Sequence, residues 1–195
     1  MTDTPSLDPR TTALLVMDFQ SLIVEMFPDG KDALLARAAR LIDAARKAHT
    51  MVVYVAVGFR PGYPEVSSKN ASFGPIKESG RFAAGGEGTE IHTSVAPLAG
   101  EPIVTKHRVG AFFGTDLDMI LRANGIETLL LAGIATSGVV LSTLRHAADA
   151  DYRVVVVRDC CSDRDEEIHR VLMEKVFSRQ ATVMDADAVV AALGR

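Results

Sequence analysis

The sequence has no tryptophan, only two cysteines and few aromatic residues, and each shortage narrows what the protein can be. Aromatic residues make up 6% of the 195 positions while hydrophobic residues reach 48%, so the core must be built mainly from aliphatic side chains. The two cysteines, Cys160 and Cys161, are adjacent, and the geometry of a disulfide strains a bond between sequence neighbours. We therefore expect reduced thiols and a cytoplasmic protein.

An excess of basic residues and long hydrophobic runs are also missing. The net charge is −4, whereas nucleic-acid-binding proteins usually carry a basic surplus. No apolar run reaches the roughly 18 residues that a membrane-spanning helix needs. The polar opening MTDTPSLDPR does not have the apolar core of a signal peptide. We expect neither nucleic acid nor a membrane as a partner.

Short aliphatic runs are present instead, and they alternate with amphipathic stretches. Continuous aliphatic runs are typical of strands that are buried on both faces. The predicted strands are 12–18, 51–59, 102–106, 128–134 and 152–159. Apolar residues at helical spacing, together with helix start and stop signals, predict the helices. The predicted helices are 31–48, 115–125, 137–151 and 162–177, and 181–195 predicts a last short strand and a closing helix.

This alternation predicts the fold class. Strands that alternate with helices form right-handed βαβ units, so we expect an α/β fold, a three-layer α/β/α sandwich around a mostly parallel, doubly wound sheet. The length suits a single domain over residues 1–195. Thr115 with Asp118, and Ser162 with Asp165, have the spacing of helix-capping pairs. Residues 60–90 are rich in Gly, Pro and Ser, show no period and predict a long, partly ordered excursion.

The ends of the predicted strands indicate where chemistry belongs, because open α/β sheets bind ligands outside the carboxyl ends of their strands. Asp18 ends the first strand and Lys106 ends the third. They are either a catalytic pair or a structural ion pair. Asp159, at the end of the fifth strand, is expected to be a helix cap. His107 alternates to the opposite face from Lys106 and is expected to be structural.

Small residues follow the fourth strand. With little side-chain bulk, the backbone amides of this turn could hold an anion or a developing oxyanion. A plain tight turn, capped by Thr136 or Ser137, is the alternative. The residues of the turn are Ile134, Ala135, Thr136, Ser137 and Gly138.

Five segments, taken together, resemble the isochorismatase-like hydrolase superfamily, whose larger branch is called the cysteine hydrolases. They are LLVMDFQ (14–20), GTEI (88–91), IVTKHRVGAFFGTDLDMILRANGI (103–126), LLLAGIATSGVVLST (129–143) and YRVVVVRD (152–159). The resemblance implies an Asp–Lys–Cys triad, in which Asp18 and Lys106 match the acid and the lysine. The cysteine position, six residues after Gly133, is Val139. The resemblance also implies a cis peptide bond between Ile134 and Ala135.

The resemblance further narrows the reaction. Isochorismatase-type relatives also lack the cysteine and cleave a vinyl ether, releasing pyruvate, with the aspartate as general acid. On this resemblance the chain is a hydrolase of a small molecule that uses Asp18 and Lys106 and tolerates Val139. Asp18 would then have to be partly protonated, which Lys106 opposes and burial favours. The alternatives are a non-catalytic ligand-binding or scaffold protein, and an amidase whose nucleophile is Cys160, Cys161 or Ser137.

The remaining expectations concern binding. An anionic substrate favours cationic partners, for which Arg60, Arg81 and Arg108 are candidates, Arg108 being nearest to Lys106. Apolar walls could come from the aromatic residues Phe19, Phe59 and Phe113, whereas Phe112 is expected in the core. The nicotinamidase branch of the superfamily binds a metal through Asp and His residues after the second strand, but GFRPGYPEVSS has no His. We expect no metal and no cofactor, and by resemblance a homodimer or homotetramer.

Overall fold

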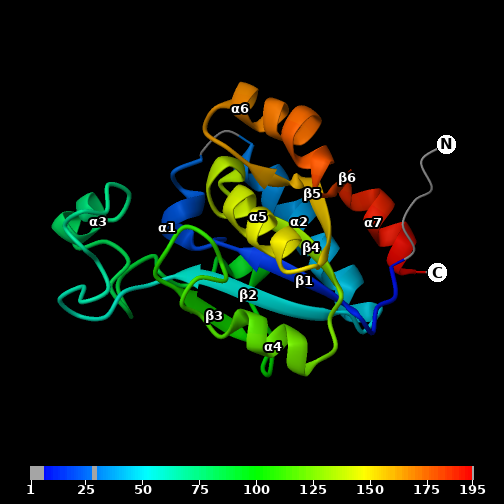
Figure 1. Cartoon of the computed structure of the whole chain (residues 1–195), viewed down its shortest axis with the longest axis horizontal. Helices are drawn as coiled ribbons and strands as arrows, with labels where there is room; N and C mark the ends of the chain where they lie inside the picture. The colour runs from blue at the N-terminus through cyan, green and yellow to red at the C-terminus, as the bar shows by residue number, and fades with distance from the viewer. Residues whose placement is uncertain (1–6, 28–29, 195) are drawn as a thin grey trace.

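One six-stranded sheet organises the computed structural model, which describes residues 7–27 and 30–194. All neighbouring strands are parallel, in the order β3-β2-β1-β4-β5-β6. The predicted α/β sandwich is confirmed, and the sheet is wholly rather than mostly parallel (Figure 1). The strands are β1 (Thr12–Met17), β2 (Met51–Val57), β3 (Ile103–Lys106), β4 (Thr128–Ile134), β5 (Arg153–Ser162) and β6 (Thr182–Met184).

Helices cover both faces of the sheet (Figure 1). Alternate residues of β1 face α2 and α7 on one side, and α4, α5 and the helical segment that begins with α6 on the other. The α-helices are α1 (Ser21–Val24), α2 (Lys31–Lys47), α3 (Gly74–Ser79), α4 (Leu117–Ala123), α5 (Leu141–Asp149), α6 (Glu166–Val171) and α7 (Ala186–Leu193). Shorter helical turns are η1 (Thr93–Val95), η2 (Thr136–Val140), η3 (Leu172–Val176) and η4 (Phe177–Arg179).

The central strands explain why the sequence shows continuous apolar runs. Every residue of β1 and of β4 is buried, because helices pack on both faces of a parallel sheet. Each large aliphatic side chain that is fully buried stabilises the fold by about 1.5–3 kcal/mol relative to an exposed one. None of the described helices is both long and apolar enough to cross a membrane.

Two predicted helix starts are wrong. Strand β5 continues through Ser162, so α6 begins later and is capped by Asp165, whose carboxylate accepts hydrogen bonds from the amides of Glu167 and Ile168. Pairing with β4, whose Ile134 lies opposite Ser162, holds this extra length of strand. Helix α4 begins only at Leu117.

The carboxylate of Asp118 does not close a capping pair with Thr115. It accepts a hydrogen bond of 2.9 Å from the hydroxyl of Tyr152, so a tertiary contact outcompetes the local one. The hydroxyl of Thr115 still accepts a hydrogen bond of 3.3 Å from the amide of Leu117. Spacing alone therefore identified the region of the helix start but not its bonding.

The excursion at 60–90 carries α3 away from the body of the molecule, beyond the carboxyl end of β2 (Figure 1). Short α3 is its one helix among the described residues. The excursion has its own apolar cluster, which joins it to the end of β2. The buried members are Val57, Phe59, Tyr63, Val66, Phe73 and Phe82. This segment is therefore ordered by packing rather than by repeated hydrogen bonding.

Candidate active site

Asp18 and Lys106 meet at the carboxyl ends of their strands. Asp18 directly follows β1, Lys106 is the last residue of β3, and β2 lies between these strands. The Nζ atom of Lys106 lies 2.9 Å from Oδ2 of Asp18, and the two side chains are only 3% and 7% exposed. The structure thus brings together two charged groups that are distant in the sequence.

The backbone at Asp18 has an uncommon conformation. Its φ is 61°, in the left-handed region, which Asp tolerates better than most residues with a side chain. The amide of Asp18 donates a hydrogen bond of 2.8 Å to the carbonyl of Val55 in β2. The strand direction therefore changes at Asp18 while the residue remains tied to the sheet.

The environment of Asp18 favours a carboxyl that carries a proton. Burial raises the pKa of Asp18, while the neighbouring Lys106 ammonium opposes this rise. Desolvation is the larger effect, because the hydration free energy that a buried carboxylate loses exceeds the attraction that a single neighbouring ammonium provides. Among the described residues, nothing hydrogen-bonds its Oδ1. Lys106 has a second partner, the carbonyl of Arg108 at 3.2 Å.

A cavity of about 370 Å³ opens beside this pair, and we call it the Asp18 cavity. Its charged members are Asp18, Lys106, Asp163 and Arg164. Its apolar walls come from α1 and its flank, from the excursion and from the strand ends. They include Ile23, Met26, Phe27, Val57, Phe73, Ile76, Phe82, Val109 and Val139. Such a mixture of an apolar wall and a few charges is typical of a small-molecule site.

The small residues after β4 allow close packing against the acid's strand. A Cβ added to Gly133 would lie 3.1 Å from both Cβ and the carbonyl oxygen of Met17, which is tighter than ordinary contact. The peptide bond between Ile134 and Ala135 is cis, as the resemblance implies. Val139 is 2% exposed and lines the Asp18 cavity. Its isopropyl group offers no nucleophile.

The amides of the turn are partly occupied already. The amide of Ser137 donates a hydrogen bond of 2.7 Å to Oδ2 of Asp163, and that of Gly138 donates to the carbonyl of Ala135 at 3.1 Å. These two donors are therefore not free for an oxyanion, contrary to the expectation for the whole turn. The hydroxyl of Thr136 is bonded to Nδ1 of His169 at 2.8 Å.

Besides the buried Lys106, the cavity has an exposed cation, Arg164, which the sequence reasoning missed. Its guanidinium carbon lies 5.5 Å from the ring centroid of Phe27, another wall residue. A cation over an aromatic face is held by the ring's quadrupole without losing its hydrogen-bond donors. Arg164 follows the fifth strand, so the rule about strand carboxyl ends, applied beyond Cys161, would have pointed to it.

The five residues predicted to bind substrate are not among the described residues that line the Asp18 cavity, although Phe59 and Arg60 line a second, larger hollow. Phe19 and Phe59 are each 1% exposed within apolar clusters, while Phe113 is 69% exposed. The guanidinium of Arg60 pairs with Glu65. That of Arg108 donates to the carbonyl of His107, so only the backbone of Arg108 reaches the lysine.

The three alternative nucleophiles, Cys160, Cys161 and Ser137, are poorly placed or poorly activated for attack on a substrate in the Asp18 cavity. Cys160 and Cys161 are buried on opposite faces of β5 and do not line the cavity. Burial raises the pKa of the Cys161 thiol to about 12 and that of Cys160 further, so neither is a ready thiolate. Ser137 does line the cavity, but among the described residues no side chain hydrogen-bonds its hydroxyl.

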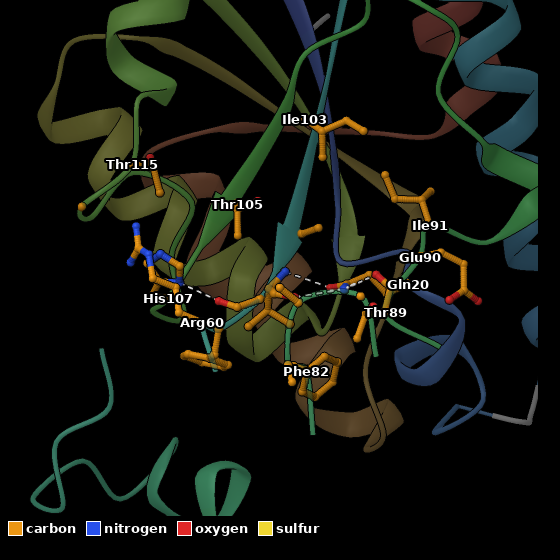
Figure 2. A pocket seen from close by; sticks show the side chains of 18 of the residues that line it. Gln20, Arg60, Phe82, Thr89, Glu90, Ile91, Ile103, Thr105, His107 and Thr115 are labelled. Carbon is orange, nitrogen blue, oxygen red and sulfur yellow. Dashed lines mark hydrogen bonds between the residues drawn. The ribbon is translucent and has the colours of Figure 1, made fainter. Parts of the chain in front are cut away.

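A larger, separate hollow of about 900 Å³ lies along edge strand β3, and Figure 2 shows its lining. It contains neither Asp18 nor Lys106. Gln20 lies in its floor, donating to the carbonyls of Val57 and Thr89 and accepting from the amide of Val57, so its amide group is saturated. His107 bonds the carbonyl of Gly58 through Nδ1, in line with a structural role. The Asp18 cavity, which contains both Asp18 and Lys106, is therefore the better candidate for the active site.

Other expected caps and ligands can be placed as well. Asp159 accepts a hydrogen bond of 2.7 Å from the amide of Ala186, so it caps α7 rather than the helix that follows it in sequence. Phe112 is buried in the core and stacks on His146. Within residues 7–27 and 30–194, no three His, Cys, Asp or Glu side chains are grouped to hold a metal ion.

Comparison with known proteins adds a family to this geometry. The sequence profile of the Isochorismatase domain matches residues 12–188. A maleamate amidohydrolase of Pseudomonas putida is 29% identical over 90% of this chain and 83% of its own length. A probable isochorismatase of Pseudomonas chlororaphis is 33% identical over 95% and 87%, respectively. The solved structure of an isochorismatase family protein from Burkholderia thailandensis is 30% identical, with a TM-score of 0.80 over 98% of this chain and 99% of its own.

Proposed function

The chain belongs to the isochorismatase family of hydrolases, and from this premise we propose that it hydrolyses a small anionic vinyl ether without a cysteine nucleophile. The observation that carries this proposal is the presence in one cavity of a buried Asp18, whose pKa is raised by burial, and of Val139. An acid of this kind can donate a proton, whereas a valine cannot attack a carbonyl. Relatives include both an amidohydrolase and a probable isochorismatase, so the residues of the cavity must decide between them.

In the proposed reaction, Asp18 protonates the methylene carbon of the vinyl ether. The ether oxygen then shares the positive charge as an oxocarbenium ion, and water adds to the substituted carbon. The resulting hemiketal collapses to a ketone, which is pyruvate for an enolpyruvyl ether, and an alcohol. The proton released by the water returns to the carboxylate of Asp18. A raised pKa suits this role, because a general acid works best when its pKa is near the working pH.

Lys106 and Arg164 would bind the anionic group of the substrate. The ammonium of Lys106 is held by Asp18 and by the carbonyl of Arg108, so it is fixed in place. Arg164 is an exposed residue of the same lining, and its guanidinium can donate hydrogen bonds to a carboxylate. The apolar walls around Phe27, Phe73 and Ile76 suit an unsaturated carbon skeleton.

A non-catalytic binding protein is the second candidate, because Val139 removes the nucleophile of the cysteine branch. On that reading the cavity binds anions but turns none over. An amidase with a relocated thiol has weaker support, since neither cysteine lines the cavity and burial raises both thiol pKa values. Asp18, which has a free and buried oxygen, favours the catalytic reading.

The test is turnover of a panel of enolpyruvyl ethers and matched primary amides by the purified protein. We expect pyruvate release from at least one ether and a loss of about 100-fold or more in kcat for Asp18→Asn. The double variant Cys160→Ala/Cys161→Ala is the matched control and should keep full turnover. Unchanged turnover in Asp18→Asn would refute the mechanism. Binding of ethers without any turnover would establish the non-catalytic alternative instead.

A further inference from the structure

The turn that walls the Asp18 cavity is hydrogen-bonded to the segment that follows β5. Two consecutive turn residues each bond a side chain of that segment. The hydroxyl of Thr136 bonds Nδ1 of His169 at 2.8 Å, and the amide of Ser137 donates to Asp163 at 2.7 Å. Ala135, Ser137, Gly138 and Val139 of this turn line the cavity. The cavity wall is therefore bonded at two adjacent residues to the segment after β5, once to Asp163 before α6 and once to His169 in α6.

Thr136 depends on His169 for the satisfaction of its side chain. Thr136 is 0% exposed, and a buried hydroxyl without a hydrogen bond is costly. Among the described residues, His169 is the side chain that bonds it. The turn itself is a single stretch of π-helix, η2, a conformation that is rare and recurs at functional sites. A fixed side-chain bond is a direct way to hold such a turn in one position.

His169 also reaches the outside of the molecule. His169 lines a surface hollow of about 390 Å³ that shares no lining residue with the Asp18 cavity. The charged groups that face it there are Arg158 from β5 and Glu166, Glu167, Arg170 and Glu174 from α6 and η3, with Asp163 from the connection before α6. Burial lowers the pKa of His169 from its ordinary value despite the acidic neighbours, which disfavours the charged form of the ring.

We propose that His169 is a positioning residue, which sets the cavity wall through its hydrogen bond to Thr136, with Asp163 holding the next residue of the same turn. His169 itself does not line the Asp18 cavity. Its effect on the reaction is exerted through the position of Ser137, Gly138 and Val139. The inference that catalysis depends on this position rests on the proposed function.

The kinetic arm compares His169→Leu, Thr136→Val and the double variant with wild type. Displacing the wall by a fraction of an ångström should lower kcat about ten-fold with a smaller change in KM. The double variant should lose no more than either single variant, because both remove the same bond. His169→Asn, whose amide can occupy the position of Nδ1, should recover most of kcat. Full kcat in correctly folded His169→Leu would overturn the proposal, as would failure of Asn to restore a lost kcat.

The second arm needs no substrate and separates this proposal from the proposed function. In NMR spectra recorded between pH 4.5 and 8, the amide signals of Ser137, Gly138 and Val139 should shift with the same midpoint as the His169 ring. They should not follow that midpoint in Thr136→Val or His169→Asn, in which the other acidic and basic neighbours remain. Amide signals that ignore the His169 titration in wild type would overturn the positioning role, whether or not the protein proves to be an enzyme.

Discussion

At the scale of single residues, the central feature of the proposed site is the buried carboxyl group of Asp18. Asp18 is next to a lysine, yet its pKa is raised, because burial outweighs the single favourable charge. Ionising a buried carboxyl group lowers the stability of the fold. Such groups are common at active sites, where a reaction needs a protonated acid. The same residue adopts a left-handed backbone conformation, which a glycine would adopt more easily.

The first prediction concerns stability as a function of pH. Because the folded pKa of Asp18 lies above its unfolded value near 3.8, the unfolded chain ionises first as pH rises. Stability contributed by the protonated acid is present below pH 3.8 and is lost as pH rises through the folded pKa. We therefore expect Asp18→Asn to gain stability relative to wild type between pH 4 and pH 8, measured by urea unfolding. A difference that stays constant across this range would show that Asp18 ionises normally.

The second prediction concerns Arg164, the exposed cation of the cavity. Arg164→Gln should raise KM for a carboxylate-bearing substrate about ten-fold while kcat changes little, because a charged hydrogen bond is lost from ground state and transition state alike. Arg60→Gln is the matched control, since Arg60 pairs with Glu65 outside this cavity. Steady-state kinetics decide. An equal effect of the two variants would contradict the role of Arg164.

At the scale of elements, local sequence signals compete with strand pairing. Ser162 has the residue type and spacing of a helix cap, but β4 draws it into β5, opposite Ile134. The cap then falls to Asp165, three residues later. Asp159 shows a related effect, because it caps α7, which lies next to it in space and not in sequence. Capping residues can be recognised locally, while the helix that each one serves is decided by packing.

The third prediction tests this assignment. Asp165→Ala should lower the free energy of unfolding by about 1 kcal/mol, since two amides of α6 lose their acceptor. For a chain of this size that corresponds to a fall of about 2–4 °C in melting temperature. Ser162→Ala, at the cap position that the spacing suggested, should change it by less than half as much. Calorimetry distinguishes the two, and the reverse order would mean that Ser162 is the cap after all.

At the scale of the whole molecule, the site is assembled from several parts of the chain that are far apart in the sequence, α1 and its flank among them. The sheet supplies the acid and the lysine, the segment after β4 supplies one wall, the segment after β5 supplies the cation, and the excursion supplies another wall. The excursion packs on the end of β2 through its own apolar cluster. Its sequence can therefore vary with less effect on the sheet than a change in a central strand would have.

The fourth prediction follows from this arrangement. Ile76 of α3 lines the Asp18 cavity and is only half-buried. Ile76→Ala should enlarge the cavity and raise kcat/KM for bulky substrates relative to small ones, at a cost in stability of about 1 kcal/mol. Ile103→Ala, in the larger hollow along β3, is the control and should leave this ratio unchanged. If only Ile103→Ala changed the substrate preference, the result would indicate that the substrate binds in the larger hollow.

The sequence by itself determined the layered α/β architecture, a mostly parallel sheet and the position of Asp18 and Lys106 at the ends of their strands, while the family resemblance implied that the two residues share one site. The architecture and the strand ends follow from local patterns, because aliphatic runs mark buried strands, and strands joined through helices run parallel, so that their carboxyl ends lie at the same edge of the sheet.

Only the tertiary structure decided which side chains complete the cavity. Arg164, Phe27 and Ile76 lie on short or irregular segments with no period of their own, and Phe19, Phe59 and Phe113 were equally plausible by residue type. Whether such a side chain faces the cavity depends on how segments far apart in the sequence pack against one another, which no local pattern encodes.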